Sequence, residues 1–176
     1  MIFHQLFDKT SSTFTYLLGD PKTGRALVID SVLENNSHIL RLLKDSGLHL
    51  VLAIDTHTHA DHITGLGALR EETGCKTMMG AQSLANCLSE KFKDGDQLTA
   101  GKIQIEVIYT PGHTDDSYSF YMADQGVLFS GDTLLIGGTG RTDFQNGDAG
   151  TQYDSLHDRI LRLPDSTMLY PGHDYN

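Results

Sequence analysis

Short apolar runs separated by polar residues dominate the first third of the chain. Three of these runs predict the strands of an antiparallel meander, and they cover residues 2–7, 13–18 and 26–30. Between Glu34 and Gly47 the apolar side chains instead recur at helical spacing, and the glycine is a typical helix end. Residues 48–54 then form a nearly continuous apolar run, as expected for a strand that is covered on both faces. Strands, a helix and a buried strand in this order predict an α/β fold.

The same two periodicities continue to the end of the chain. We expect further helices over residues 63–74, 82–88 and 148–163. We expect further strands over residues 76–79, 102–109, 117–122, 126–129 and 168–170. A turn at 94–96 and a glycine-rich loop at 137–144 interrupt them. Because the chain has no repeat, low-complexity stretch or long linker, we predict one domain over residues 1–176.

Charge and hydropathy narrow the range of partners. The chain has 13 Lys and Arg against 23 Asp and Glu, a formal net charge of −10, and no basic run. We therefore expect no nucleic-acid partner. No apolar stretch approaches the roughly eighteen residues that a membrane helix needs, so we also expect no membrane span.

Two features bear on the cellular compartment. Cys75 and Cys87 do not form a CxxC pair and nothing requires a disulfide, so a reducing compartment is the simpler interpretation. The amino terminus alternates and carries Asp8 early, unlike a secretion signal. We predict the cytoplasm of a bacterium or the mitochondrial matrix, and a removed transit peptide stays open.

The strongest chemical signal is the segment Thr56–His62, which follows the buried strand at 48–54. It places four metal-ligand side chains within six residues, and imidazole and carboxylate suit zinc, iron and related divalent ions. His57 and His59 are two apart and point the same way if the strand period persists, whereas Asp61 and His62 follow the turn. The alternative, a chance cluster of structural histidines, is the weaker interpretation.

Other ligand-type side chains also follow predicted strands. His113 lies in PGHT after the strand at 102–109, Asp132 lies in GDT after the strand at 126–129, and His173 lies in PGHD at the last strand. In layered α/β folds sites form where strand ends meet, so we expect these ends to converge. The remaining histidines lie in ordinary strand or helix context, and we interpret them as structural or surface residues: His4, His38, His49 and His157.

The order HxHxDH, PGHT, GDT and PGHD resembles the metallo-β-lactamase superfamily. The resemblance covers nearly the whole chain and implies a four-layer αββα sandwich with the site along one edge of two packed sheets. Within the superfamily, the segments 14–20, 111–117 and 138–145 resemble the persulfide dioxygenases. That resemblance implies an enzyme whose partners are glutathione persulfide and O₂ and whose products are sulfite and glutathione.

The resemblance to this branch also implies the site residues. One Fe(II) per chain would be held by His57, His113 and Asp132, a set that leaves positions open for a thiolate-type substrate and O₂. The catalytic side chains that orient ligands and water would be His59, Asp61, His62 and His173. Arg141 and Tyr175 match positions that line the substrate pocket, and a guanidinium suits the carboxylates of glutathione. A loop-anchoring salt bridge is the alternative role for Arg141, and a structural role is the alternative for Tyr175.

Ligand counting leaves a second enzyme class open. Every position that holds two zinc ions in the hydrolytic relatives is present, namely His57, His59, Asp61, His62, His113, Asp132 and His173. A dinuclear hydrolase of the glyoxalase II kind, acting on S-acylglutathione thioesters, is therefore the alternative, because intrinsic affinity favours zinc over Fe(II). The chain ends three residues after His173, whereas both families continue, so we expect that a short C-terminal extension is missing. A non-catalytic metal-binding interaction module is the third hypothesis, and a homodimer stays open.

Overall fold

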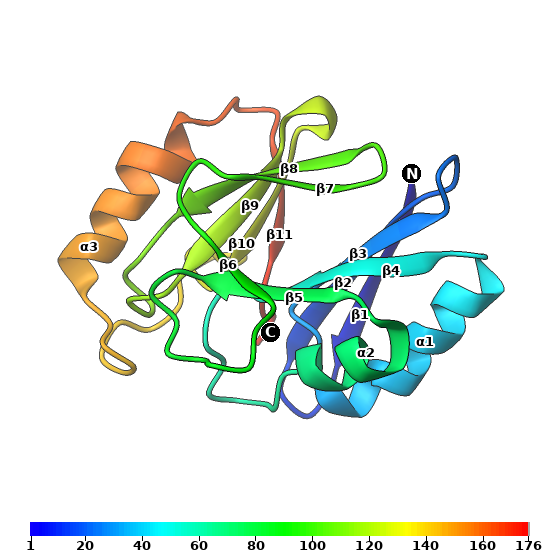
Figure 1. Cartoon of the computed structure of the whole chain (residues 1–176). Helices are drawn as coiled ribbons and strands as arrows, with labels where there is room; N and C mark the ends of the chain where they lie inside the picture. The colour runs from blue at the N-terminus through cyan, green and yellow to red at the C-terminus, as the bar shows by residue number, and fades with distance from the viewer. Residues whose placement is uncertain (176) are drawn as a thin grey trace.

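The structure is a computed structural model that describes residues 1–175, and its core is a pair of packed β-sheets. The first sheet has six strands in the order β1-β2-β3-β4-β5-β6 (Figure 1). Its strands are β1 (Ile2–Asp8), β2 (Thr13–Asp20), β3 (Arg25–Ile29), β4 (His49–Ile54), β5 (Lys76–Gly80) and β6 (Glu90–Phe92). The pairs β1/β2 and β2/β3 are antiparallel, which confirms the predicted meander, and β3 to β6 pair in parallel.

The second sheet has five strands in the order β11-β10-β9-β8-β7. Its strands are β7 (Gln97–Ala100), β8 (Ile103–Tyr109), β9 (Tyr118–Met122), β10 (Val127–Gly131) and β11 (Met168–Pro171). The hairpin β9/β10 is antiparallel, as predicted, and turns through the short helix η2 (Ala123–Gln125). Strand β11 pairs in parallel with β10, so both strands end at the same edge of the sheet.

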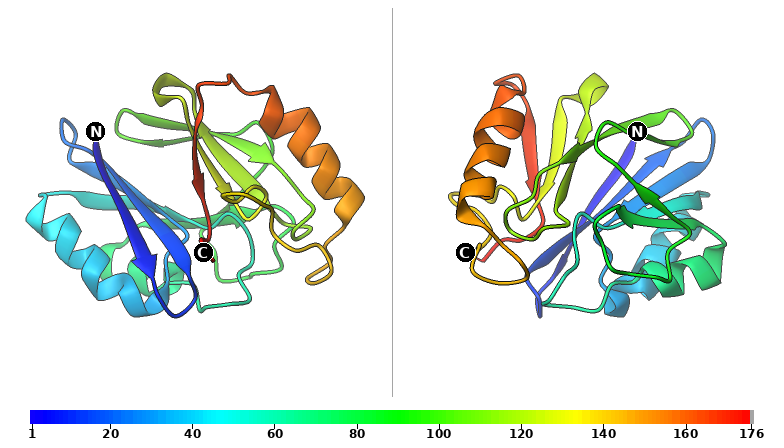
Figure 2. Two further views of the ribbon diagram at one scale, coloured as in Figure 1. Left: turned by 180° about the vertical axis from the view of Figure 1, so that it is seen from behind. Right: turned by 60° about the vertical axis from the view of Figure 1, so that its left-hand side comes forward.

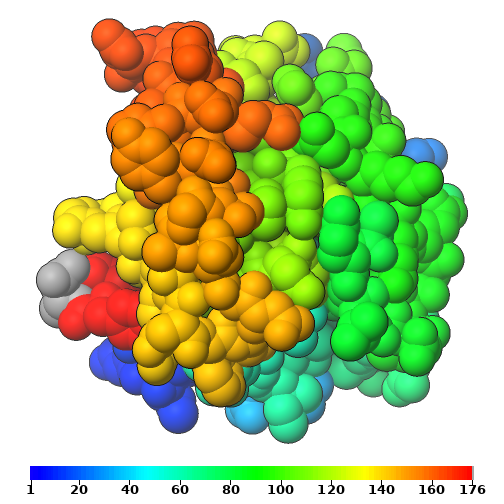
Figure 3. Space-filling model, turned by 90° about the vertical axis from the view of Figure 1, so that its left-hand side faces the viewer, coloured from blue at the N-terminus to red at the C-terminus, as the bar shows by residue number. Residues whose placement is uncertain are grey.

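Helices cover the outer face of each sheet. A short turn η1 (Leu33–Asn35) leads into α1 (Asn36–Asp45), and α1 and α2 (Leu66–Thr73) pack on the first sheet (Figures 1 and 2). On the second sheet α3 (Ala149–Asp154) continues as η3 (Ser155–Arg159) and η4 (Ile160–Arg162), and Figure 3 shows these turns in orange across that face. The predicted four-layer αββα sandwich is therefore confirmed.

The main core lies between the two sheets and follows from strand alternation. Ile103, Ile105 and Val107 of β8 point into this layer, while the intervening side chains at 104 and 106 are exposed. Leu52 and Ile54 of β4 pack in the same layer. Neighbouring side chains of β4 pack under the helices, so this strand is apolar on both faces, as its sequence predicted.

The prediction of a helix over residues 82–88 is wrong. The segment is irregular because Ser83 accepts a hydrogen bond from the amide of Ala85 through its side chain, a local contact that competes with a helix. Its carbonyls find partners outside the segment: the side chain of Lys91 donates to Ser83, and that of Arg70 donates to Cys87.

The short strands β6 and β7 were not predicted. Each has three or four residues and only one or two buried side chains, so local periodicity is weak. Each exists because a longer neighbour, β5 or β8, supplies its hydrogen bonds. Among the described residues, helices are all too short or too polar to cross a bilayer.

Candidate metal centre

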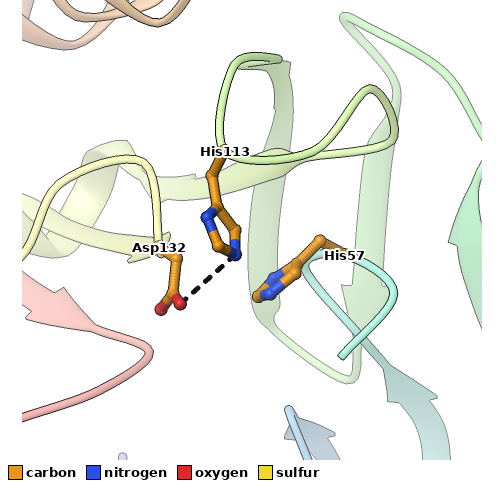
Figure 4. Close-up of side chains that lie close together, drawn as sticks. All are labelled: His57, His113 and Asp132. Carbon is orange, nitrogen blue, oxygen red and sulfur yellow. Dashed lines mark ion pairs between the residues drawn. The ribbon is translucent and has the colours of Figure 1, made fainter. Parts of the chain in front are cut away.

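The predicted convergence of strand ends is confirmed. The strand β4 ends at Ile54 and leads to His57, and β8 ends at Tyr109 and leads to His113. Strands β10 and β11 of the second sheet end next to Asp132 and His173. Because the two sheets pack face to face, strand ends that lie far apart in sequence meet along one edge of the sandwich (Figure 1). Three ligand-type side chains from the segments after these strands lie close together there (Figure 4).

His57, His113 and Asp132 form one group of ligand-type side chains, here called the triad. Each offers one donor atom, and these atoms lie within 4.8 Å of one another (Figure 4). Nε2 of His113 is 3.5 Å from Oδ2 of Asp132, and the rings of His57 and His113 are edge to face with centroids 4.9 Å apart. The three side chains predicted as metal ligands therefore come together in the structure.

The charge states of the triad suit a divalent cation. Burial, followed by the neighbouring His59, lowers the pKa of His57 to about 3, so its imidazole is neutral. Burial opposes ionisation of Asp132, yet the hydrogen bond from His173 holds the pKa of Asp132 at about 2. His113 donates from Nδ1 to the carbonyl of Arg141 at 2.7 Å, which leaves the Nε2 lone pair for a metal. Two imidazoles and one carboxylate are a ligand set that fits Fe(II) or zinc.

His173 lies between two carboxylates. Its Nδ1 donates to Oδ1 of Asp132 at 2.6 Å, and its Nε2 donates to Oδ2 of Asp61 at 3.0 Å. Burial disfavours the imidazolium, but these two carboxylates raise the pKa of His173 to about 10. Thr13 of β2 donates to the same Asp61 oxygen at 3.0 Å. His173 thus fixes the orientation of Asp132 and leaves Oδ2 of that carboxylate facing the other members of the triad.

A second group of ligand-type side chains, His59, Asp61 and His62, lies beside the triad. Its donor atoms are also within 4.8 Å of one another. Within the part of the chain that the structure describes, Nδ1 of His59 and Nε2 of His62 are buried without a hydrogen-bond partner. Unpartnered buried nitrogens are costly, so water or a second cation is the natural partner for this group.

Asp30 is a residue of the site that the sequence analysis missed. It directly follows β3, is fully buried, and adopts a left-handed backbone with φ of 53°. Its Oδ1 accepts from the amide of Thr56 at 2.7 Å and from Nε2 of His59 at 3.2 Å, which turns Nδ1 of His59 toward the second group. The available signal was a carboxylate at a strand end, the same signal that identified Asp132.

The two predicted substrate residues lie at the rim of the site. The guanidinium of Arg141 is exposed and paired with the neighbouring Asp143, with Nε to Oδ1 at 2.7 Å. The ring of Tyr175 is stacked on His173 with centroids 5.2 Å apart and is largely exposed. Both side chains are within reach of solvent beside the triad, and their contact with substrate stays a prediction.

A sandwich of two sheets with histidines and aspartates along one edge defines a class of metal-dependent enzymes, and the family comparison agrees. The family described as the metallo-beta-lactamase superfamily matches residues 9–173. The persulfide dioxygenase ETHE1, mitochondrial, of Homo sapiens is 44% identical over 100% of this chain and 69% of the relative. The crystal structure of ETHE1 from Myxococcus xanthus matches with a TM-score of 0.96 and 48% identity, over 100% of this chain and 77% of that chain.

A hydrolase is also among the relatives. A hydroxyacylglutathione hydrolase of Polaromonas sp. is 34% identical over 92% of this chain and 62% of the relative. The chain belongs to the metallo-β-lactamase superfamily and, within it, to the persulfide dioxygenase family. The predicted family and the prediction of an enzyme are thereby confirmed, and the hypothesis of a non-catalytic module is set aside.

Proposed function

We propose that the protein oxidises the outer sulfur of glutathione persulfide with O₂ at a single Fe(II). The observation that carries this proposal is the similarity to persulfide dioxygenases over the whole chain, which is higher and more complete than the similarity to the hydrolase. In the balanced reaction, glutathione persulfide, O₂ and water give glutathione, sulfite and two protons. The sulfur–sulfur bond breaks, the outer sulfur is oxidised, and O₂ is reduced.

The chain's own residues would divide this work. His57, His113 and Asp132 would hold the iron, and the donor set of two imidazoles and one carboxylate is typical of non-haem Fe(II) oxygenases. Bound Fe(II) would supply the redox chemistry that O₂ requires. His173 keeps Asp132 oriented, and Nδ1 of His59, which lacks a hydrogen-bond partner among the described residues, would orient water beside the triad.

At the rim, we assign substrate binding to Arg141 and Tyr175. An exposed guanidinium can exchange its pairing with Asp143 for a carboxylate of glutathione, because both are charge-assisted and the guanidinium is freely accessible. The ring of Tyr175 offers an apolar wall next to His173. Asp61 and His62 would complete the water-binding side of the site through their hydrogen bond of 2.8 Å.

Oxygen consumption tests the proposal directly. Protein reconstituted with Fe(II) should consume O₂ and form sulfite in equal amounts when glutathione persulfide is added. The same protein loaded with Zn(II) is the matched control and should do neither, because zinc has no redox chemistry. If the iron form consumes no O₂ while either form hydrolyses S-lactoylglutathione, the dioxygenase proposal is refuted.

One structural observation favours the hydrolase as the second candidate. The group His59, Asp61 and His62 has two buried nitrogens without hydrogen-bond partners among residues 1–175, and a second metal would satisfy both. Thioester hydrolysis at two zinc ions would use this group, whereas the dioxygenase would leave it to water. Metal analysis of protein saturated with each ion separates the two: one metal per chain favours the dioxygenase, and two favour the hydrolase.

The compartment is also a proposal. Cys75 is buried, Cys87 is exposed, and both are free, which suits a reducing compartment such as a bacterial cytoplasm or the mitochondrial matrix. An exposed free thiol would oxidise readily in a secreted protein. The homodimer stays a prediction that size-exclusion chromatography with light scattering can test.

A further inference from the structure

Residues 137–147, which carry Arg141, are here called the substrate loop. This loop is hydrogen-bonded to the side chain of one triad member and to the backbone of another. The amide of Gly140 donates to the carbonyl of Asp132 at 2.8 Å. The carbonyl of Arg141 accepts from Nδ1 of His113 at 2.7 Å. The substrate loop is therefore part of the support of Asp132 and His113, because both bonds act directly on residues that face the metal position.

A third bond links the substrate loop to the segment of His57. Nε2 of Gln145 donates to the carbonyl of Thr58 at 2.8 Å, across 87 residues of sequence. Thr58 lies between His57 and His59, so this bond ties the substrate loop to the segment that carries both rings. With this contact, the substrate loop touches all three segments that supply the triad.

Thr58 is held firmly from its other side. The buried carboxylate of Asp116 accepts hydrogen bonds from the hydroxyl and from the amide of Thr58, and it also accepts from the hydroxyl of Thr114 at 2.7 Å. Asp116 thereby joins the His57 segment to the turn that bears His113. Since Thr58 is fixed in this way, the bond from Gln145 positions the substrate loop and not Thr58.

A pocket borders the substrate loop. Gln145 and Asn146 border a cavity of about 250 Å³ together with Thr58 and Asp116. Gln145 and Asn146 both have a left-handed backbone conformation, with φ of 48° and 59°. Residues other than glycine rarely adopt this conformation. A conformation of this kind persists only where other contacts impose it, and the hydrogen bond from the side-chain amide of Gln145 is such a contact.

We propose that Gln145 is a positioning residue that sets the distance between the guanidinium of Arg141 and the metal triad. A glutathione held by its carboxylate at Arg141 then presents its sulfur to the metal, and loss of the Gln145 bond separates the two contacts. The inference rests on the proposed function for its substrate class, a glutathione thiol or persulfide. It adds a residue that touches neither the substrate nor the metal.

A binding experiment without turnover tests the inference. The protein is loaded with Co(II), whose absorption reports a sulfur ligand, and titrated with glutathione in the absence of O₂. Gln145→Gly permits the left-handed backbone and removes the side-chain amide. Gln145→Glu keeps the size of the side chain, but its carboxylate cannot donate a hydrogen bond. Both variants should bind glutathione three- to tenfold more weakly, which corresponds to about 0.7 to 1.4 kcal/mol. At saturation they should show a weaker thiolate-to-cobalt band.

Asn146→Gly is the matched control. It relaxes the adjacent left-handed residue and breaks the bond from Asn146 to Asp115, 3.2 Å long, which does not involve the His57 segment. This variant should bind glutathione within twofold of the wild type and give the full cobalt band. Cobalt affinity should be unchanged in all three variants, and the melting temperature should change by only a few degrees, as expected for one hydrogen bond.

Several outcomes would overturn the inference. An equal loss of glutathione affinity in Asn146→Gly would mean that loop flexibility alone matters. Wild-type affinity in Gln145→Gly would mean that the hydrogen bond from Gln145 does not affect binding. A melting temperature that falls in step with affinity would make the role structural. Failure of the wild-type cobalt protein to bind glutathione would also refute it. Failure of the proposed function would instead be seen as absent O₂ uptake by the iron protein. The glutathione affinities of the cobalt-loaded variants could still be compared in that case.

Discussion

Replacing Gly140 by alanine should disturb the metal centre through one added methyl group. A Cβ at this position would lie 2.5 Å from the carbonyl oxygen of Asp132 and 2.7 Å from Nδ1 of His113. Ordinary contacts of this kind are about 3.5 Å or more, so roughly 1 Å of movement is needed. A backbone carbonyl and a ring held by the carbonyl of Arg141 cannot move this far without breaking the bonds that orient the triad.

The size of the effect follows from this overlap. Overpacking of a well-packed site costs about 1 to 3 kcal/mol, which for a chain of this size lowers the melting temperature by roughly 2 to 4 °C for each kcal/mol. A displacement of about 1 Å at a reacting centre can cost up to about 100-fold in rate. Gly140→Ala should therefore lower kcat/KM by roughly tenfold to a hundredfold and weaken metal retention.

Gly138→Ala in the same loop is the matched control. Its Cβ would meet no heavy atom within 4 Å, and its backbone is not left-handed. This variant should keep wild-type activity and gain up to about 1 kcal/mol of stability, because alanine restricts the unfolded chain. Metal content, melting temperature and steady-state kinetics of both variants decide the matter. If Gly140→Ala matches Gly138→Ala in all three, the close approach does not support the metal centre.

Three further predictions follow from the site. Asp132→Ala should lose bound iron and activity together, whereas Asp61→Ala should retain iron, as measured by metal analysis. Comparable iron loss in both variants would make Asp61 a ligand and contradict the mononuclear assignment. Arg141→Ala should raise KM for glutathione persulfide by roughly tenfold to a hundredfold, because a charge-assisted bond is worth about 1.5 to 3 kcal/mol, while iron content stays constant; an unaltered KM in folded, iron-loaded protein would remove Arg141 from the substrate site. In metal-free protein the pKa of His173 is raised from 6.5 to about 10, so its stabilising contribution is complete below about pH 6.5 and is lost as the pH rises through about 10. Urea denaturation of metal-free protein between pH 6 and pH 10 should show this decline, which Asp61→Ala should reduce; a rise in stability over that range would contradict it.

The sequence by itself determined most of the elements and indicated the candidate ligand side chains. Alternation over residues 103–109 and the apolar run of β4 depend only on which faces are buried, and burial imprints a period on neighbouring residues. The cluster at His57 to His62 is equally local, since its members lie within six residues. Such features are readable because their cause and their pattern occupy the same stretch of chain.

Only the tertiary structure decided how these pieces act together. Asp30 is a carboxylate at a strand end, but its role appears only when β3 and β4 lie side by side and bring it to Thr56 and His59. The same holds for His173, whose two carboxylate partners lie 41 and 112 residues away. The irregular segment at 82–88 belongs here too, because side chains outside it satisfy its backbone. Contacts between distant residues leave no periodic trace in either partner, so packing alone reveals them.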